Sequence, residues 1–478
     1  MAWDAYQFGP SAPRITSLLR ALVKWPRNAA RIEHVELQAC NFQPYGDRED
    51  DETAGRPANC HGYSLRASDK PAFERDLTRM GWRNVDTWLT ALFVDNDLRA
   101  VIAVLLMRCT RLKSLNVASE PFLTVFSDPG TWLPSMLNHC LSAPASSDRG
   151  LSRFHDLKFV VITGPTNECG RKLPPDVIKC LFRIPSLLTL DIACCPDLST
   201  RMNEDVRPEV MAGCIALDRL AVLRLPLAAA SPRTLKALLQ FTSSLKTLVY
   251  DVLMPVRSFS DEHFADALAT VPETLEELTV RVHVYSGASW FRFSHRRPVR
   301  DGGVGSLQRL RNLRSLTIPP CLLFGFDPLD PVVPQLADVL PFSLESLHLV
   351  GDLAAFQSAR LCGARVEAIL RSFLAGQERA DKPWSHRCLH GGAEFEEGER
   401  GCKPVWVCQG PPRWKSDFPH PKRITVIEDY SGYFGGEDMV MNKRRCEALN
   451  EMMSDQGLDV VYIEADDYRD IQAEYEFE

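Results

Sequence analysis

Apolar residues recur along this chain in a six-residue pattern, apolar-x-x-apolar-x-apolar. In an extended strand, alternate side chains point to opposite faces, so the last two apolar residues of each copy share one face. The pattern therefore predicts a series of short strands, each buried on one side. The copies begin at Ile32, Leu112, Phe154, Leu187, Leu220, Leu245, Leu275, Leu313 and Leu344.

Helical patterns precede most of these predicted strands. Leu98, Ile102 and Leu105 recur at three- or four-residue spacing, as on one face of a helix. Several such patterns stop at a proline, because proline cannot continue a helix and favours extended geometry in the residue before it. Strands that alternate with helices predict a parallel sheet. The prolines are Pro185, Pro272 and Pro341.

The recurrence exceeds what chance provides. A chain of this composition should hold on the order of ten loose matches, but only roughly two of the stricter form Leu-x-x-Leu-x-apolar. The stricter form recurs throughout residues 112–349. Cys40, Cys195 and Cys321 stand three residues beyond a copy, where leucine-rich repeats often carry Asn or Cys. We therefore predict an α/β leucine-rich-repeat solenoid, an irregular horseshoe with a parallel sheet on its concave face and helices on its convex face.

The copies are unevenly spaced, which predicts insertions between repeats. Within the first gap, the apolar residues at 75–95 have helical spacing. The second insertion is rich in glycine, proline and glutamate, and strand and helix patterns resume beyond it. The expected segments are a solenoid at 14–375 with a loop excursion at 43–72, an inserted loop at 376–417, divergent C-terminal repeats acting as a cap at 418–470, and an acidic tail at 471–478.

Composition narrows the functional classes. The 478 residues carry a net charge of −7, which argues against a nucleic-acid surface because phosphate binding favours a basic face. The longest apolar run, Val101 to Met107, is far too short to span a membrane, and the N-terminus lacks the pattern of a secretory signal. The fifteen scattered cysteines fit reduced thiols. We expect a cytoplasmic or nuclear protein without nucleic-acid or membrane partners.

The polar positions of the predicted strands form the candidate binding surface. Stacked strands line the concave face of a solenoid, which is its usual binding surface. We predict that a protein partner binds there and that no cofactor is needed. The pattern does not identify this partner. The candidate residues are Asn116, Asp156, Lys158, Asp191, Arg224, Glu277 and His348.

The inserted loop offers an alternative function. Its imidazole and thiol side chains are of the types that bind zinc, although no Cys-x-x-Cys pair occurs there. The alternative is a metal-stabilised or catalytic protein that acts through residues 376–417. Elsewhere we find no Gly-x-Ser-x-Gly, His-Glu-x-x-His or phosphate-loop motif, so we expect no enzyme. The residues concerned are His386, Cys388, His390, Cys402 and Cys408, with Trp384, Trp406 and Trp414 as candidate partner anchors or loop pins.

Several segments resemble one family. Residues 98–117, 307–323 and 336–349, together with Gly457-Leu458-Asp459-Val460, are similar to the leucine-rich-repeat region of fungal F-box-like proteins. The resemblance implies substrate recognition for a ubiquitin ligase. In that family an N-terminal F-box binds the Skp adaptor, but only one helical pattern precedes Ile32 here. We therefore do not expect this chain to bind the Skp adaptor by itself.

Overall fold

The chain forms two compact units. Unit 1 comprises Met1–Leu198, Val206–Ala229 and Phe241–Ser243, and unit 2 comprises Ser199–Asp205, Ala230–Gln240 and Ser244–Glu478. The computed structural model describes residues 13–38, 65–82, 84–95, 97–118, 132–142, 151–163, 175–193, 195–198, 206, 211, 214–255, 261–285, 304–324, 336–351, 363–375, 377–379, 406–408, 423–427, 443–454 and 458–463.

A parallel sheet of eleven strands runs through the described residues. Its order is β1-β2-β3-β4-β5-β6-β7-β8-β9-β12-β13, so the strands lie side by side almost in the order of the chain. Each strand is followed by a connection that returns to the same end of the sheet, as parallel pairing requires. The α/β class and the parallel sheet predicted from the hexads are therefore confirmed.

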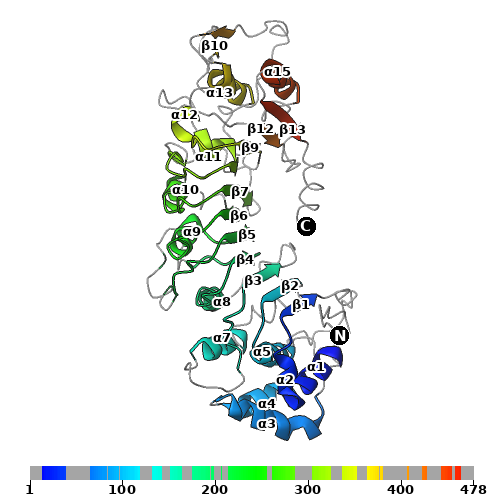
Figure 1. Cartoon of the computed structure of the whole chain (residues 1–478). Coiled ribbons are helices and arrows are strands. Elements are labelled where there is room, and N and C mark those ends of the chain that lie inside the picture. Colours follow the sequence, from blue (N-terminus) through cyan, green and yellow to red (C-terminus); the bar gives the residue numbers. More distant parts are fainter. Residues whose placement is uncertain are drawn as a thin grey trace. The chain divides into compact units, whose positions relative to one another are not determined.

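Unit 1 holds the first five strands of this sheet and the helices that precede them (Figure 1). Helix α5 is buried along nearly its whole described length, because it contacts α1, α4 and α7 on different sides. A helix that is apolar all round belongs in a core. The elements are α1 Pro13–Lys24, α2 Pro26–Ala29, β1 His34–Gln38, η1 Ala67–Asp69, α3 Lys70–Arg79, α4 Val85–Phe93, α5 Leu98–Arg108, β2 Ser114–Ala118, α7 Trp132–Ser142, β3 Phe159–Thr163, α8 Pro175–Leu181, β4 Thr189–Ile192 and β5 Val222–Ala228.

The first gap between hexads contains helices that the sequence pattern describes only in part. The helical pattern at 75–95 corresponds to two helices, α3 and α4, because Gly81 adopts a φ of 82° that ends the first of them. The predicted loop excursion at 43–72 is wrong at its end, since residues 67–72 already belong to η1 and α3. Strand β1 pairs directly with β2, so no strand intervenes between them in the sheet.

The third strand lies three residues later than its hexad predicts. Leu115 of β2 pairs with Val160, and Leu190 of β4 pairs with the same residue, so β3 buries Val160 and Ile162. The predicted copy Phe154-Leu157-Phe159 is therefore wrong, and the actual copy is Leu157-Val160-Ile162. Phe159 consequently points away from the core.

Unit 2 repeats the strand and helix alternation, and Figure 1 shows α9, α10 and α12 on the same side of strands β6 to β9. Pro232 stands in the first turn of α9, where the Ser231 hydroxyl accepts a hydrogen bond from the Thr234 N–H at 3.3 Å. The elements are α9 Pro232–Leu239, β6 Thr247–Pro255, α10 Asp261–Leu268, β7 Glu277–Tyr285, β8 Ser315–Ile318, α11 Pro320–Phe324, α12 Leu336–Val339, β9 Ser346–Val350, α13 Gly363–Ala375, β10 Gln377–Arg379, β11 Trp406–Cys408, β12 Arg423–Ile427, α15 Lys443–Met453 and β13 Asp459–Ile463.

The C-terminal strands continue the same sheet. Strand β12 pairs with β9 on one side and β13 on the other, with Ile424 beside Leu347 and Val460. The strand and helix patterns predicted beyond the inserted loop are thus present as β12, α15 and β13. Within the region predicted to be an inserted loop, β10 and β11 form a separate antiparallel pair.

Charged residues that lie just before neighbouring strands form ion pairs at the N-terminal ends of these strands. In unit 1, the Lys113 ammonium lies 2.6 Å from a Glu33 carboxylate oxygen. In unit 2, Lys246 lies 2.8 Å from Glu276, and this hydrogen bond lowers the pKa of the Glu276 carboxyl. These pairs are exposed to solvent, so each contributes little to stability. Because opposite charges lie next to each other, the observed pairing of strands is nevertheless favoured over a pairing that would bring like charges together.

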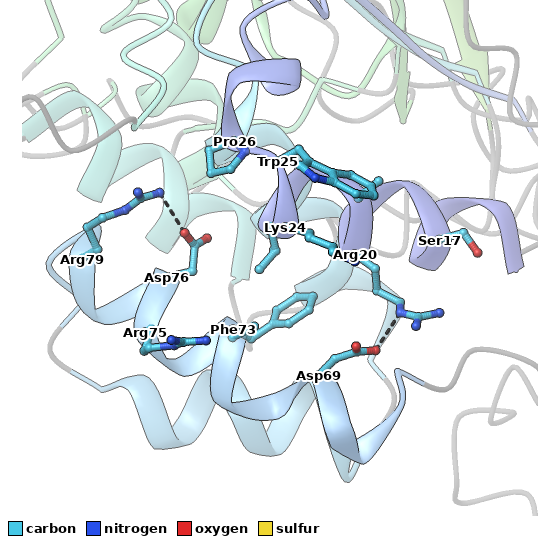
Figure 2. Close-up of a pocket in the computed structure, with 13 residues that line it drawn as sticks. Ser17, Arg20, Lys24, Trp25, Pro26, Asp69, Phe73, Arg75, Asp76 and Arg79 are labelled. Carbon is cyan, nitrogen blue, oxygen red and sulfur yellow. Dashed lines mark hydrogen bonds and ion pairs between the residues drawn. The ribbon is translucent and has the colours of Figure 1, made fainter.

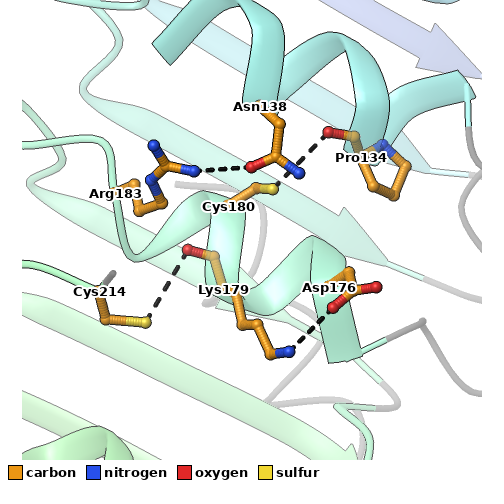
Figure 3. Close-up of polar contacts among 7 residues, drawn as sticks. All are labelled: Pro134, Asn138, Asp176, Lys179, Cys180, Arg183 and Cys214. Atoms are coloured by element: carbon orange, nitrogen blue, oxygen red, sulfur yellow. Dashed lines mark hydrogen bonds and ion pairs between the residues drawn. The ribbon is translucent and has the colours of Figure 1, made fainter. Parts of the chain in front are cut away.

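The Cys180 thiol and the Arg183 side chain connect α8 and the residues just after it to α7 (Figure 3). The Cys180 thiol donates to the Pro134 carbonyl at 3.9 Å, and the Cys214 thiol donates to the Lys179 carbonyl at 4.0 Å. Above α8, the Arg183 guanidinium donates to Asn138 Oδ1 at 2.6 Å. These cysteines therefore act as packing residues between neighbouring repeats.

We expect the buried thiols to resist alkylation in the folded chain. Burial raises the pKa of Cys109 and Cys446 to about 12 and that of Cys180 to about 11, and the reactive form is the thiolate. Mass spectrometry after iodoacetamide treatment at mildly alkaline pH should find them unmodified, whereas denatured chain should be fully modified. Rapid alkylation of native protein would contradict this packing.

The same shifts give a pH dependence of stability. A thiol whose pKa is higher in the folded chain than its ordinary value of 9.0 loses its proton first in the unfolded chain. The free energy of unfolding should therefore fall as pH rises above 9. Urea denaturation at increasing pH measures this fall, and Cys109→Ala should reduce its slope. An identical slope in that variant would count against the assignment.

Candidate functional site

The outward face of the strands in unit 1 presents two rows of side chains. Strand register aligns the first residues of β1 to β5 in one row and the third residues in another. Because the residues between them are buried, these rows lie on the face opposite the core. The first row is His34, Ser114, Phe159, Thr189 and Val222, and the second is Glu36, Asn116, Val161, Asp191 and Arg224.

Polar pairs occupy both sides of this face. At β1 and β2, His34 Nδ1 lies 2.8 Å from the Ser114 hydroxyl, and Asn116 donates to Glu36 at 3.4 Å. At β4 and β5, the Arg224 guanidinium lies 4.0 Å from an Asp191 carboxylate oxygen. The sequence pattern predicts Asn116, Asp191 and Arg224 on this face, and the structure places all three there.

The middle of the face is apolar. Phe159 is 44% exposed, and the register places it between Ser114 and Thr189, whose side chains are too small to cover its ring. Val161 follows two residues later on the same strand and is half-buried. An exposed aromatic side chain flanked by polar pairs is the arrangement found at the centre of protein interfaces.

Two predicted binding residues do not lie on the strand face. Asp156 is exposed in the turn before β3, and Lys158 lies just ahead of the strand, where its N–H donates to the Lys113 carbonyl at 2.8 Å. Their placement on the face was wrong because the hexad of β3 begins three residues later than predicted. The same error concealed Phe159, which the pattern assigned to the core.

In unit 2, the predicted residues Glu277 and His348 both lie on the outward strand face. Glu277 is exposed and accepts a hydrogen bond from the Thr247 hydroxyl at 3.3 Å. His348 is half-buried between Thr317 and Thr425, which are both buried. Desolvation, and to a lesser degree Arg423, lowers the pKa of His348. His348 is therefore less accessible to a partner than the face of unit 1.

Unit 2 also contains a histidine–carboxylate pair that the hexads do not predict. His283 Nε2 lies 2.9 Å from Asp251 Oδ1 across β6 and β7. These two strands extend through Pro255 and Tyr285, well beyond the six residues of the repeat pattern, so the pair lies outside the predicted strand positions. Its evident effect is to hold the extended ends of the two strands together.

The remaining sequence candidates lie outside the described residues. This applies to His386, Cys388, His390, Cys402, Trp384 and Trp414, while Trp406 and Cys408 are described only as part of the backbone of β11. Within the described part of the chain, no cluster of three or more His, Cys, Asp or Glu side chains is arranged to hold a metal ion. No described helix has the length and apolarity needed to cross a bilayer.

Sequence comparisons add no family assignment. No family model matches the chain, and no curated protein matches its sequence.

Proposed function

We propose that the chain is a recognition protein of leucine-rich-repeat type that binds a protein partner through the strand face of unit 1. The observation that carries the proposal is the exposed ring of Phe159 in the middle of this face. Full burial of a phenylalanine side chain is worth about 1.5–3 kcal/mol. Phe159 is 44% exposed, so a partner that covers it can recover roughly half of this free energy.

The surroundings of Phe159 favour a protein over a small ligand. The face is a run of adjacent strands, and it carries a hydrogen-bonded pair on one side of its apolar centre and an ion pair on the other. Such a surface suits a partner that places an apolar side chain against Phe159 and Val161 and polar groups around them. The strand ladder fixes these side chains in advance, which lowers the entropy lost on binding.

The resemblance to fungal F-box-like proteins extends this proposal to a process. In that setting the partner is a substrate that is delivered to a ubiquitin ligase, and another subunit makes the contact with the Skp adaptor. The compartment proposed for this activity is the cytoplasm or the nucleus, where such ligases act.

The experiment compares the full chain with Phe159→Ala and a matched control, Phe342→Ala. Phe342 is 53% exposed in unit 2, so both changes remove one exposed phenyl ring. Each tagged chain is used to capture partners from an extract of cells that express it, with quantitative mass spectrometry. We expect a partner whose affinity falls about 30-fold in Phe159→Ala, as for an interface hot spot worth about 2 kcal/mol.

The control decides the interpretation. A partner retained by Phe342→Ala and lost by Phe159→Ala supports the proposal, provided that circular dichroism shows both variants folded. A partner bound equally by all three chains would place recognition elsewhere on the molecule and contradict the proposed face.

A further inference from the structure

A pocket of about 770 Å³ lies within unit 1, between α1 and α2 on one side and η1 and α3 on the other. Figure 2 shows an Arg20–Asp69 pair at one end and an Arg79–Asp76 pair at the other, with Lys24, Phe73 and Arg75 between them. None of the lining residues belongs to the strand face, so this is a separate site.

The lining is basic on balance. Its charged side chains are Arg20, Lys24, Arg75 and Arg79 against Asp69 and Asp76. Arg20 lies 2.6 Å from Asp69, and Arg79 lies 3.0 Å from Asp76, so the two carboxylates are already engaged. Within the described residues, Lys24 and Arg75 form no ion pair with a lining carboxylate, and both are exposed.

A buried cation adds to this excess. Arg108 of α5 is 1% exposed and forms an ion pair with Asp76, the carboxylate that also holds Arg79. Desolvation lowers the pKa of Arg108 to about 10, so it stays protonated at neutral pH. Two guanidinium groups thus share one carboxylate of the pocket lining, so the charges of Arg79, Arg108 and Asp76 leave a net positive charge there.

The pocket also offers apolar contact. Trp25 is 53% exposed at its rim, and the Lys24 ammonium lies 4.8 Å from the centre of its ring. An exposed indole beside exposed cations can cover an apolar side chain of a ligand while the cations bind neighbouring anionic groups.

We propose that this pocket binds an acidic peptide segment of a partner protein, with an apolar or aromatic side chain against Trp25 and carboxylates facing Lys24 and Arg75. The distribution of the cations favours an extended ligand. Arg20 and Arg79 lie at opposite ends of the pocket, and Lys24 and Arg75 lie at separate points between them, whereas a phosphate site gathers its donors around one point. Charge complementarity of this kind sets both specificity and association rate.

The test measures binding of a short fluorescein-labelled peptide of Asp and Glu with one central Phe to the full chain, by fluorescence anisotropy. Lys24→Glu combined with Arg75→Glu should weaken binding about tenfold or more, because two attractive contacts become repulsive. The matched control is Arg219→Glu combined with Arg311→Glu, which changes net charge equally at exposed positions outside the pocket. The control should bind as the unmodified chain does.

Two further variants and a competition experiment distinguish peptide binding in this pocket from binding elsewhere and from phosphate binding. Trp25→Ala should weaken binding several-fold without loss of structure, and Phe159→Ala should leave it unchanged, which makes this outcome independent of the strand-face proposal. Equal weakening by both charge variants would show a non-specific effect of net charge and overturn the proposal. Displacement of the peptide by inorganic phosphate at low concentration would also overturn it, in favour of a phosphate site.

Discussion

Replacing Asp76 with alanine is expected to lower the free energy of unfolding by about 3–5 kcal/mol. Asp76 is 6% exposed and pairs with Arg108, which is 1% exposed. Removal of the carboxylate leaves a guanidinium in the core of unit 1 without its ion-pair partner, and the cost of an uncompensated buried charge is large. Urea denaturation followed by circular dichroism measures the change.

Two companion variants separate the buried pair from the exposed one. Arg79 pairs with the same carboxylate but is largely exposed, so Arg79→Ala should change stability by no more than about 1 kcal/mol. Adding Arg108→Met to Asp76→Ala should restore much of the loss, since an apolar side chain of similar length needs no counter-charge. Equal effects of Asp76→Ala and Arg79→Ala would show that Arg108 is not enclosed as described.

Replacing Val160 with aspartate is expected to cost about 4–5 kcal/mol or more, because it places an unpaired carboxylate in the core. Val160 is fully buried between Leu115 and Leu190 of the adjoining strands. The neighbouring change Phe159→Asp should alter stability by less than about 1 kcal/mol, since that position faces solvent. Thermal and urea denaturation of the two variants side by side gives the comparison.

This pair of variants also tests the strand register. If Phe159 belonged to the core, as its hexad predicts, the order of the two effects would be reversed. A shift by an odd number of residues, such as the three found for β3, moves every side chain of a strand to the other face. One of the two variants should therefore be strongly destabilised and the other little changed. Reversal would remove Phe159 from the outward strand face and with it the main support for the proposed function.

The error in β3 shows what a linear pattern can determine. The segment from Phe154 to Ile162 contains two overlapping hexads, Phe154-Leu157-Phe159 and Leu157-Val160-Ile162, and both satisfy the apolar spacing. Only the pairing with β2 and β4 distinguishes them, and this pairing joins residues far apart in the chain. A similar overlap occurs before β5, where Leu217-Leu220-Val222 overlaps Leu220-Leu223-Leu225. There the predicted copy is the later one, and the pairing of Leu223 with Leu190 agrees with it.

The pocket between α1 and α3 was beyond prediction for a related reason. Trp25 and Arg75 belong to separate helices, and neither stands in a motif that predicts the other. The Asp76–Arg108 pair likewise joins α3 to α5, and the hydrophobic pattern of α5 gave no indication of a buried cation. Sequence periodicity identifies what each element buries locally, whereas such sites arise from the packing of one element against another.

The pairing of β12 with β9 has an evolutionary consequence. Residues 351–422 intervene between these strands, yet their pairing has the same form as that of β8 with β9. Lengthening a connection adds closure entropy only slowly, by about 0.6 kcal/mol for each doubling of its length. Homologous genes can therefore gain, exchange or lose whole segments between strands while every strand keeps its neighbours. New binding specificities can then arise without a change in the sheet.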